Sequence, residues 1–192
     1  MMTSVVLIPW AETDWQSAGR LAAATPLALN DRGQEQAQRW ARELAACELA
    51  AIYRSDEKTA VQTATVLAEG TEVRAKPAPE LKEVGLGLWE GLTETQIQQR
   101  FPKVAKLWED RPASVCPPDG EDLAVASERV KKAIRKIASK HKSGAVGVVL
   151  GPLAFKLARC QLEGASLDEM RELTSSEPVW YELVGKVPPA LA

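Results

Sequence analysis

Side chains that could act as a nucleophile or as a general base are scarce in this chain of 192 residues. It has one histidine, His141, which lies in a lysine-rich stretch, and three widely spaced cysteines. The hydroxyl groups of Thr13, Ser55 and Thr59 therefore have no histidine to activate them, which argues against serine-type nucleophilic catalysis. An isolated histidine and the lack of a CxxC pair also argue against a metal site. We expect no metal and no cofactor.

The remaining candidates for chemistry are one carboxylate and a few cations. Glu83 lies in a glycine-rich stretch that we expect to form a loop, and it could serve as an acid. With no nucleophile nearby, it is more typical of a solvated or hydrogen-bonded loop carboxylate. Arg54 and Lys58 flank Ser55-Asp56 and could supply positive charge, although side chains near a helix start are usually exposed. We expect Lys156, early in a later helix, to be solvated.

Composition and charge are those of an ordinary globular protein. The formal net charge of −2 gives no general attraction to nucleic acid or to acidic membranes, so neither is an expected partner. The apolar run 5–8 has no basic region before it, and no apolar stretch approaches the roughly 20 residues needed to span a bilayer. We expect one cytoplasmic domain over residues 1–192, with a loosely ordered tail from about residue 185.

Apolar strands alternate with amphipathic helices along the chain. This alternation predicts an α/β fold, a three-layer sandwich with a mostly parallel central sheet flanked by helices. Asn30 is a good N-cap for the first long helix, and Ser55 or Asp56 could cap the next. The expected strands are 5–8, 49–53, 72–75, 145–150 and 179–183. The expected helices are 31–46, 55–67, 94–100, 103–109, 121–140 and a segment from about 152 to 162.

Five blocks of residues match, in order and at similar spacing, the motifs of one known family. On these residues the chain resembles the phosphoglycerate mutase-like members of the histidine phosphatase superfamily over roughly 5–183. The resemblance implies the α/β sandwich of that family. The matching residues are Gly19-Arg20, Pro26-Leu27, Gly33, Gln36-Ala37, Ser55-Asp56, Ala60, Gln62-Thr63-Ala64, Leu81, Glu83, Gly87, Trp89-Glu90-Gly91, Pro117-Pro118, Gly120-Glu121 and Arg129.

The resemblance also implies a reaction, which is phosphoryl transfer through a phosphohistidine. A second histidine and two arginines would hold the phosphoryl oxygens, and a carboxylic acid would protonate the leaving group. The first arginine, the nucleophilic histidine and the glycine after it are replaced here by Pro9, Trp10 and Ala11. The second arginine and the second histidine are replaced by Thr59 and Gly151. The family's reaction centre is therefore vestigial in this chain.

The acid is the one member of this centre whose residue type is kept, at Glu83. A large Trp10 replaces one histidine while a small Gly151 replaces the other, so we expect the indole to fill the phosphate pocket. Glu12 and Glu83 would then repel phosphate. Loss of a nucleophile alone typically costs a factor on the order of 10⁶ in rate. We expect no functional catalytic residue, and the cations that could still contact a ligand are Arg20, Arg54 and Lys58.

Three interpretations of function stay open. The leading one is a catalytically inactive family member with a binding or scaffolding role, whose partner is an unknown protein or small molecule. Such a protein could form a homo-oligomer or pair with a relative of the same fold. The second is a phosphatase or other hydrolase with a centre rebuilt around Glu83 and Arg54 or Lys58. The third is an anion-binding module that uses the basic helix 129–142, although the near-neutral net charge favours an ordinary solvated helix face there.

Overall fold

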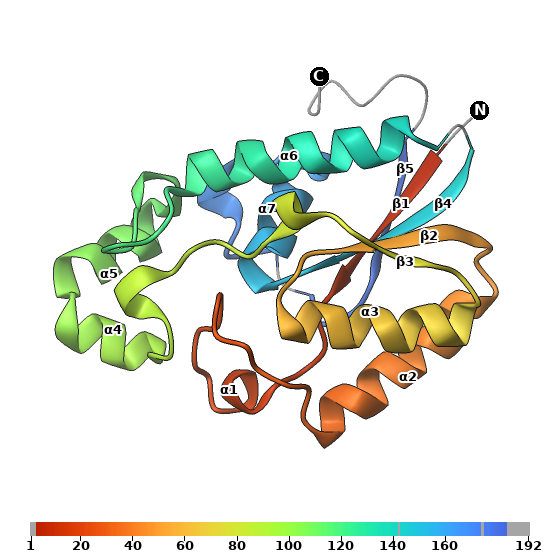
Figure 1. The fold of residues 1–192 in the computed structure, drawn as a ribbon. Coiled ribbons are helices and arrows are strands. Elements are labelled where there is room, and N and C mark those ends of the chain that lie inside the picture. Colours follow the sequence, from red (N-terminus) through yellow and green to blue (C-terminus); the bar gives the residue numbers. More distant parts are fainter. Residues whose placement is uncertain (1–2, 142, 174, 184–192) are drawn as a thin grey trace.

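A five-stranded sheet runs through the centre of the computed structural model, which describes residues 3–141, 143–173 and 175–183 (Figure 1). Its strand order is β3-β2-β4-β1-β5, and all neighbouring strands are parallel except β5, which is antiparallel to β1. The expected mostly parallel sheet is confirmed. The strands are β1 (Thr3–Pro9), β2 (Leu49–Arg54), β3 (Ala75–Pro77), β4 (Gly144–Leu150) and β5 (Val179–Leu183).

Helices cover both faces of this sheet and make the three layers expected from the sequence. Figure 1 shows α2 (Asp31–Ala45) and α3 (Lys58–Thr71) together on one side, with α6 (Leu123–Ser139) and α7 (Pro152–Glu163) on the other. The remaining helices are α1 (Asp14–Ser17), α4 (Glu94–Arg100) and α5 (Pro102–Asp110), with short 3-10 turns at Pro79–Leu81, Gly87–Trp89, Pro112–Ser114 and Leu167–Glu169. Among the described helices, none combines the length and the apolarity required to cross a membrane.

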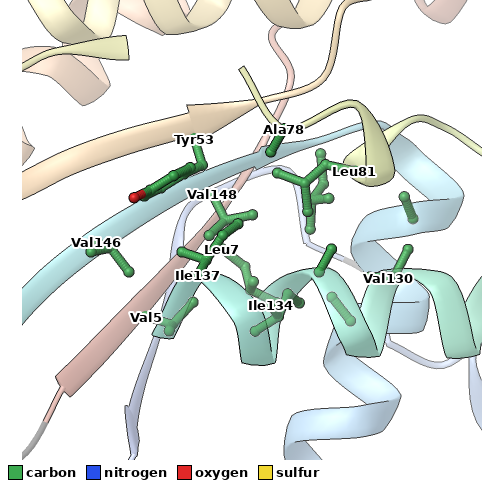
Figure 2. Packing of buried hydrophobic residues seen from close by; sticks show 14 of the residues in the cluster. Val5, Leu7, Tyr53, Ala78, Leu81, Val130, Ile134, Ile137, Val146 and Val148 are labelled. Atoms are coloured by element: carbon green, nitrogen blue, oxygen red, sulfur yellow. The ribbon is translucent and has the colours of Figure 1, made fainter. Parts of the chain in front are cut away.

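The continuous apolar run in β1 reflects burial on both faces of the sheet. Successive side chains of a strand point to opposite faces. Val5 and Leu7 accordingly pack in one cluster with α6, while Val6 and Ile8 pack in another with α2 and α3. All four are fully buried. Figure 2 shows the first cluster, in which the two β1 side chains lie near the apolar face of α6, formed by Val130, Ile134 and Ile137.

The expected bounds of two elements, α3 and β3, are wrong. The helix α3 begins at Lys58 after an N-cap at Glu57, because β2 continues to Arg54 and the chain needs the residues between to turn. The short strand β3 is Ala75–Pro77, since Glu72 takes a left-handed conformation, with φ of 57°, to end α3. The helix α3 also ends at Thr71, four residues beyond the expected end at residue 67, whereas the bounds of the other expected elements lie within two residues of the observed ones. The four-residue helix α1 was not expected, and the predicted loose tail lies outside the described residues.

The start of α2 lies unusually close to the loop that follows β1. The side chain of Asn30 caps the helix as predicted, accepting a hydrogen bond from the N–H of Gly33 at 2.8 Å. A Cβ atom on Gly33 would lie 2.1 Å from the carbonyl oxygen of Glu12 and 2.9 Å from its nitrogen. Glycine is therefore required here by close backbone approach, and this contact positions the loop that carries Trp10 and Ala11.

The contact predicts the effect of Gly33→Ala. Helix propensity alone would make this change stabilising by about 1 kcal/mol. The clash with Glu12 should outweigh that gain and lower the free energy of unfolding by about 1–3 kcal/mol, as measured by urea denaturation. Gln38→Ala, on the exposed side of the same helix, is the matched control and should change stability little. A more stable Gly33→Ala protein would show that the loop does not pack as described.

Candidate functional site: a vestigial pocket and its cleft

The vestigial pocket lies where the carboxyl ends of β1 and β4 meet. Pro9 pairs with Leu150 in the parallel ladder, and the N–H of Trp10 donates to the carbonyl oxygen of Leu150 at 2.8 Å. Trp10 and Gly151 are therefore the first residues beyond two adjacent strands. Open α/β sheets usually bind ligands at this edge.

Trp10 occupies the space beside Gly151. The tryptophan is 3% exposed and belongs to the cluster packed under α2 and α3. A Cβ atom at Gly151 would lie 3.0 Å from Cη2 of the indole and 2.4 Å from Oε2 of Glu83. An indole and a carboxylate thus take up the corner that a side chain at position 151 would need. The indole N–H of Trp10 is buried and has no acceptor among the described residues.

The two arginine positions supply no cation. Pro9 is the last residue of β1 and has no N–H to donate. Thr59 is 2% exposed, and its hydroxyl donates to the carbonyl oxygen of Leu27 at 2.9 Å. Ala11 is fully buried, and its N–H donates to the hydroxyl oxygen of Thr63 at 3.0 Å. The hydrogen-bonding groups at these positions are therefore used within the protein.

The carboxylate of Glu83 caps the start of α7. Its Oε1 accepts hydrogen bonds from the N–H groups of Val84 at 2.6 Å and Ala154 at 2.8 Å, and its Oε2 accepts one from Leu153 at 2.8 Å. The residue is only 4% exposed. Burial outweighs the three hydrogen bonds and raises the pKa of Glu83 to about 7. The expected hydrogen bonding is found, but the side chain is not solvated.

A second carboxylate, which sequence reasoning missed, lies beside Glu83. Glu57 Oε1 accepts a hydrogen bond from the backbone N–H of Glu83 at 2.8 Å, and its charge adds to the rise in the Glu83 pKa. Its Oε2 and the hydroxyl of Ser55 are buried without hydrogen-bond partners among the described residues. The only signal for Glu57 in the sequence is its place two residues after Ser55. The pocket thus holds two neighbouring carboxyl groups from separate segments of the chain.

The three cations expected near a ligand lie in different surroundings. Arg54 donates to Asp56 at 2.6 Å, and Lys58 is exposed at the start of α3. Neither lines a cleft or groove described below. Arg20 does line the cleft, where it is exposed and donates to the carbonyl oxygen of Gly91 at 2.7 Å.

A cleft of about 860 Å³ begins at Glu83 and extends between the loop after α1 and the helices α4 and α5. A groove of about 510 Å³ lies next to it and reaches Trp10. Lys156 lines both hollows and is half-buried, and burial lowers the pKa of its ammonium group. The expectation that Lys156 is solvated is therefore wrong. The sequence does not predict this burial, because it depends on how α4 and α5 pack opposite α7.

The basic side chains of the stretch 129–142 lie on α6 as far as Lys136, whereas Lys140 and His141 follow the end of that helix, and residue 142 lies outside the described residues. Arg129 pairs with Glu121 at 2.7 Å, and Lys136 pairs with Glu80 at 3.1 Å. Acidic side chains therefore neighbour these cations, which supports the solvated helix face that the net charge favours. A shallow groove of about 650 Å³ on this face is lined by residues of both charges, including Glu80, Glu128, Arg129 and Lys132.

His141 is remote from the vestigial pocket. It precedes the amino end of β4, whereas Gly151 follows the carboxyl end of the same strand. Its Nε2 lies 3.0 Å from the hydroxyl oxygen of Tyr53. Among the described residues, no group of three or more histidine, cysteine, aspartate or glutamate side chains is placed to hold a metal ion.

The raised pKa of Glu83 predicts a pH-dependent contribution to stability. Between pH 4.5 and about 7 the carboxyl ionises in the unfolded chain but stays protonated in the folded one, so stability falls as the pH rises through this window. The loss is about 3 kcal/mol and is complete above pH 7. Urea unfolding from pH 4 to 8.5 should show this fall for the native protein and a flatter profile for Glu83→Gln. Parallel profiles would contradict the assignment.

The burial of Trp10 predicts that it stabilises the fold. Trp10→Ala should lower the free energy of unfolding by about 3–5 kcal/mol, because it leaves a cavity at the ends of β1 and β4. Trp180→Ala is the matched control, since that tryptophan is 44% exposed and should cost distinctly less. Thermal or chemical unfolding measures both. Equal losses would mean that the indole does not fill the corner beside Gly151.

Similar solved structures share this architecture. Bacillus stearothermophilus YhfR superposes with a TM-score of 0.89 and 26% sequence identity, over 96% of this chain and 93% of its own. A mycobacterial glucosyl-3-phosphoglycerate phosphatase in complex with VO3 superposes with a TM-score of 0.84 over 95% of this chain and 91% of its own. That pair shares 22% identity, so it supports the fold alone.

Related sequences carry phosphatase names. Phosphoserine phosphatase 1 of Hydrogenobacter thermophilus is 28% identical over 168 residues, covering 88% of this chain and 80% of that protein. A metal-independent phosphoserine phosphatase of Arabidopsis thaliana is 31% identical over 151 residues, covering 77% of this chain and 63% of the relative. The family model of the histidine phosphatase superfamily, branch 1, matches residues 5–184. This chain therefore belongs to the histidine phosphatase superfamily.

Proposed function

We propose that this protein is a catalytically inactive member of its superfamily, with a binding or scaffolding role. The observation that carries the proposal is the position of Trp10. Its indole is buried in the corner between Gly151 and Glu83, where the family's chemistry would require a reactive ring and a bound phosphoryl group. An indole has no nitrogen lone pair with which to attack phosphorus, so no phosphohistidine-like intermediate can form there.

The charges around the pocket support the same proposal. Phosphoryl transfer depends on fixed positive donors around the transferred group. The positions that would provide them hold Pro9 and Thr59, and the carboxyls of Glu57 and Glu83 lie beside each other at the pocket. A phosphate dianion would meet two acidic side chains in a desolvated space and no cation at either of these positions, which is strongly unfavourable.

A hydrolase with a rebuilt centre is the second candidate. It is favoured by one observation, since a carboxyl with a pKa of about 7 can exchange a proton near neutral pH. The relatives' names also favour hydrolysis of phosphate esters. Against it, Arg54 is paired with Asp56 and Lys58 is exposed, so neither lines the cleft at Glu83. Glu83 itself is saturated by three backbone N–H groups.

The open volume beside the vestigial pocket supports a binding role. The cleft keeps room for a small molecule at the edge of the sheet where this architecture binds ligands. A small-molecule partner in the cleft is therefore favoured over an anionic partner on α6, where Arg129 and Lys136 are paired with Glu121 and Glu80.

Turnover of an aryl phosphate tests the proposal. Purified protein incubated with p-nitrophenyl phosphate from pH 4 to 8 should release no more product than Glu83→Ala or buffer. Phosphoserine, tested in the same way, should also remain intact. Incubation with radiolabelled substrate should leave no acid-labile phosphate on the chain. Turnover that disappears in Glu83→Ala would instead establish the rebuilt centre and end the proposal of an inactive protein.

A further inference from the structure

Lys156 is a half-buried cation without a carboxylate partner. Its side chain lies where the cleft adjoins the groove, since it lines both. Among the described residues, no carboxylate oxygen lies within 4.0 Å of its ammonium group. Burial lowers its pKa most and the charge of Arg171 adds to that effect, while the charge of Glu94, further away than 4.0 Å, opposes it only in part. A partly desolvated ammonium group without a counter-ion is unfavourable, and an anion that enters the cleft removes that cost.

The other charged groups that line the cleft are satisfied or exposed. Arg171 lies 3.9 Å from Glu94, and Glu109 accepts a hydrogen bond from Gln98 at 2.9 Å. Arg20 is exposed and donates to a backbone carbonyl, so solvent screens its charge. Lys156 is therefore the cation of the cleft on which a bound anion would gain most.

The wall of the same cleft is apolar and aromatic. Trp89 and Trp108 form an edge-to-face pair, with ring centroids 5.7 Å apart and planes at 88°. Trp89 is 1% exposed, so the ring is held rigidly by the core beneath it. An aromatic or aliphatic ligand body gains buried area and ring contacts chiefly against Trp108, which is the more exposed of the two rings. Further apolar lining residues are Leu21, Leu86, Ile97 and Met170.

We propose that the cleft binds a small monocarboxylate with an aromatic or aliphatic body, which places its carboxylate on Lys156 and its body against the apolar wall at Trp108. This inference rests on the proposed function and deepens it by naming the ligand class. A single ammonium group matches one negative charge. A phosphate dianion would bring a second negative charge into a cleft that Glu94 and Glu109 also line.

Calorimetric titration with 3-phenylpropionate as the probe tests this inference. The native protein should bind it with a saturable isotherm. Lys156→Met should weaken binding at least about tenfold, because a charge-assisted hydrogen bond is lost while the side chain keeps its length. Lys106→Met removes the same charge from the exposed side of α5, outside the cleft, and should leave the affinity unchanged.

Changes of ligand separate charge from shape. The neutral analogue 3-phenylpropanol should bind at least about tenfold more weakly than the acid, and acetate, which lacks the body, should also bind weakly. Absence of saturable binding by 3-phenylpropionate, or equal affinity in Lys156→Met, would overturn the inference. Tighter binding of phenyl phosphate would overturn the choice of a carboxylate. Hydrolysis of phenyl phosphate would contradict the proposed inactivity, which is a separate result from the Lys156 comparison.

Discussion

One corner of the molecule, at the carboxyl ends of β1 and β4, has room for a single large side chain, and Trp10 takes it. The hydrogen bond from its N–H to the carbonyl oxygen of Leu150 continues the sheet ladder and sets where the indole lies. Residue 151 must then be glycine, because a Cβ atom would meet both the indole and the carboxylate of Glu83. The start of α7 follows at once and is capped by that same carboxylate. The site is thus a packed junction of three elements, in which each side chain restricts the next.

The same junction changes the electrostatics of the family's site. A carboxyl held by three N–H groups in a dry surrounding keeps its proton to about pH 7, and Glu57 beside it reinforces this preference. A cation lies near this junction: Lys156, about one turn after the start of α7, lines the cleft. The fold therefore has a ligand-sized hollow with a cation and an aromatic side chain beside the pocket that Trp10 and Glu83 occupy. Membership of the superfamily describes this scaffold, whereas function has to be argued from these side chains.

Much of the fold could be predicted from the spacing of apolar residues along the sequence and from the residues that can cap helices. The run Val5–Ile8 had to be a strand buried on both faces, and Asn30 capped α2 as its side chain allows. The start of α3 could not be predicted, because Ser55 and Asp56 are both good capping residues. The choice between them and Glu57 depends on how far β2 continues beside β4. The residues of α3 therefore predict that a helix forms, whereas the pairing of β2 with β4 decides where that helix begins.

For the candidate site, the sequence by itself determined which chemical groups are present: a tryptophan, a glycine and a glutamate stand where two histidines and an acid would act, and no second histidine exists in the chain. Only the tertiary structure decided that the indole and Gly151 adjoin, that Glu57 lies next to Glu83, and that Lys156 faces a cleft. These contacts join residues from separate elements. Burial and pKa depend on everything packed around a group, which residue type and spacing do not specify.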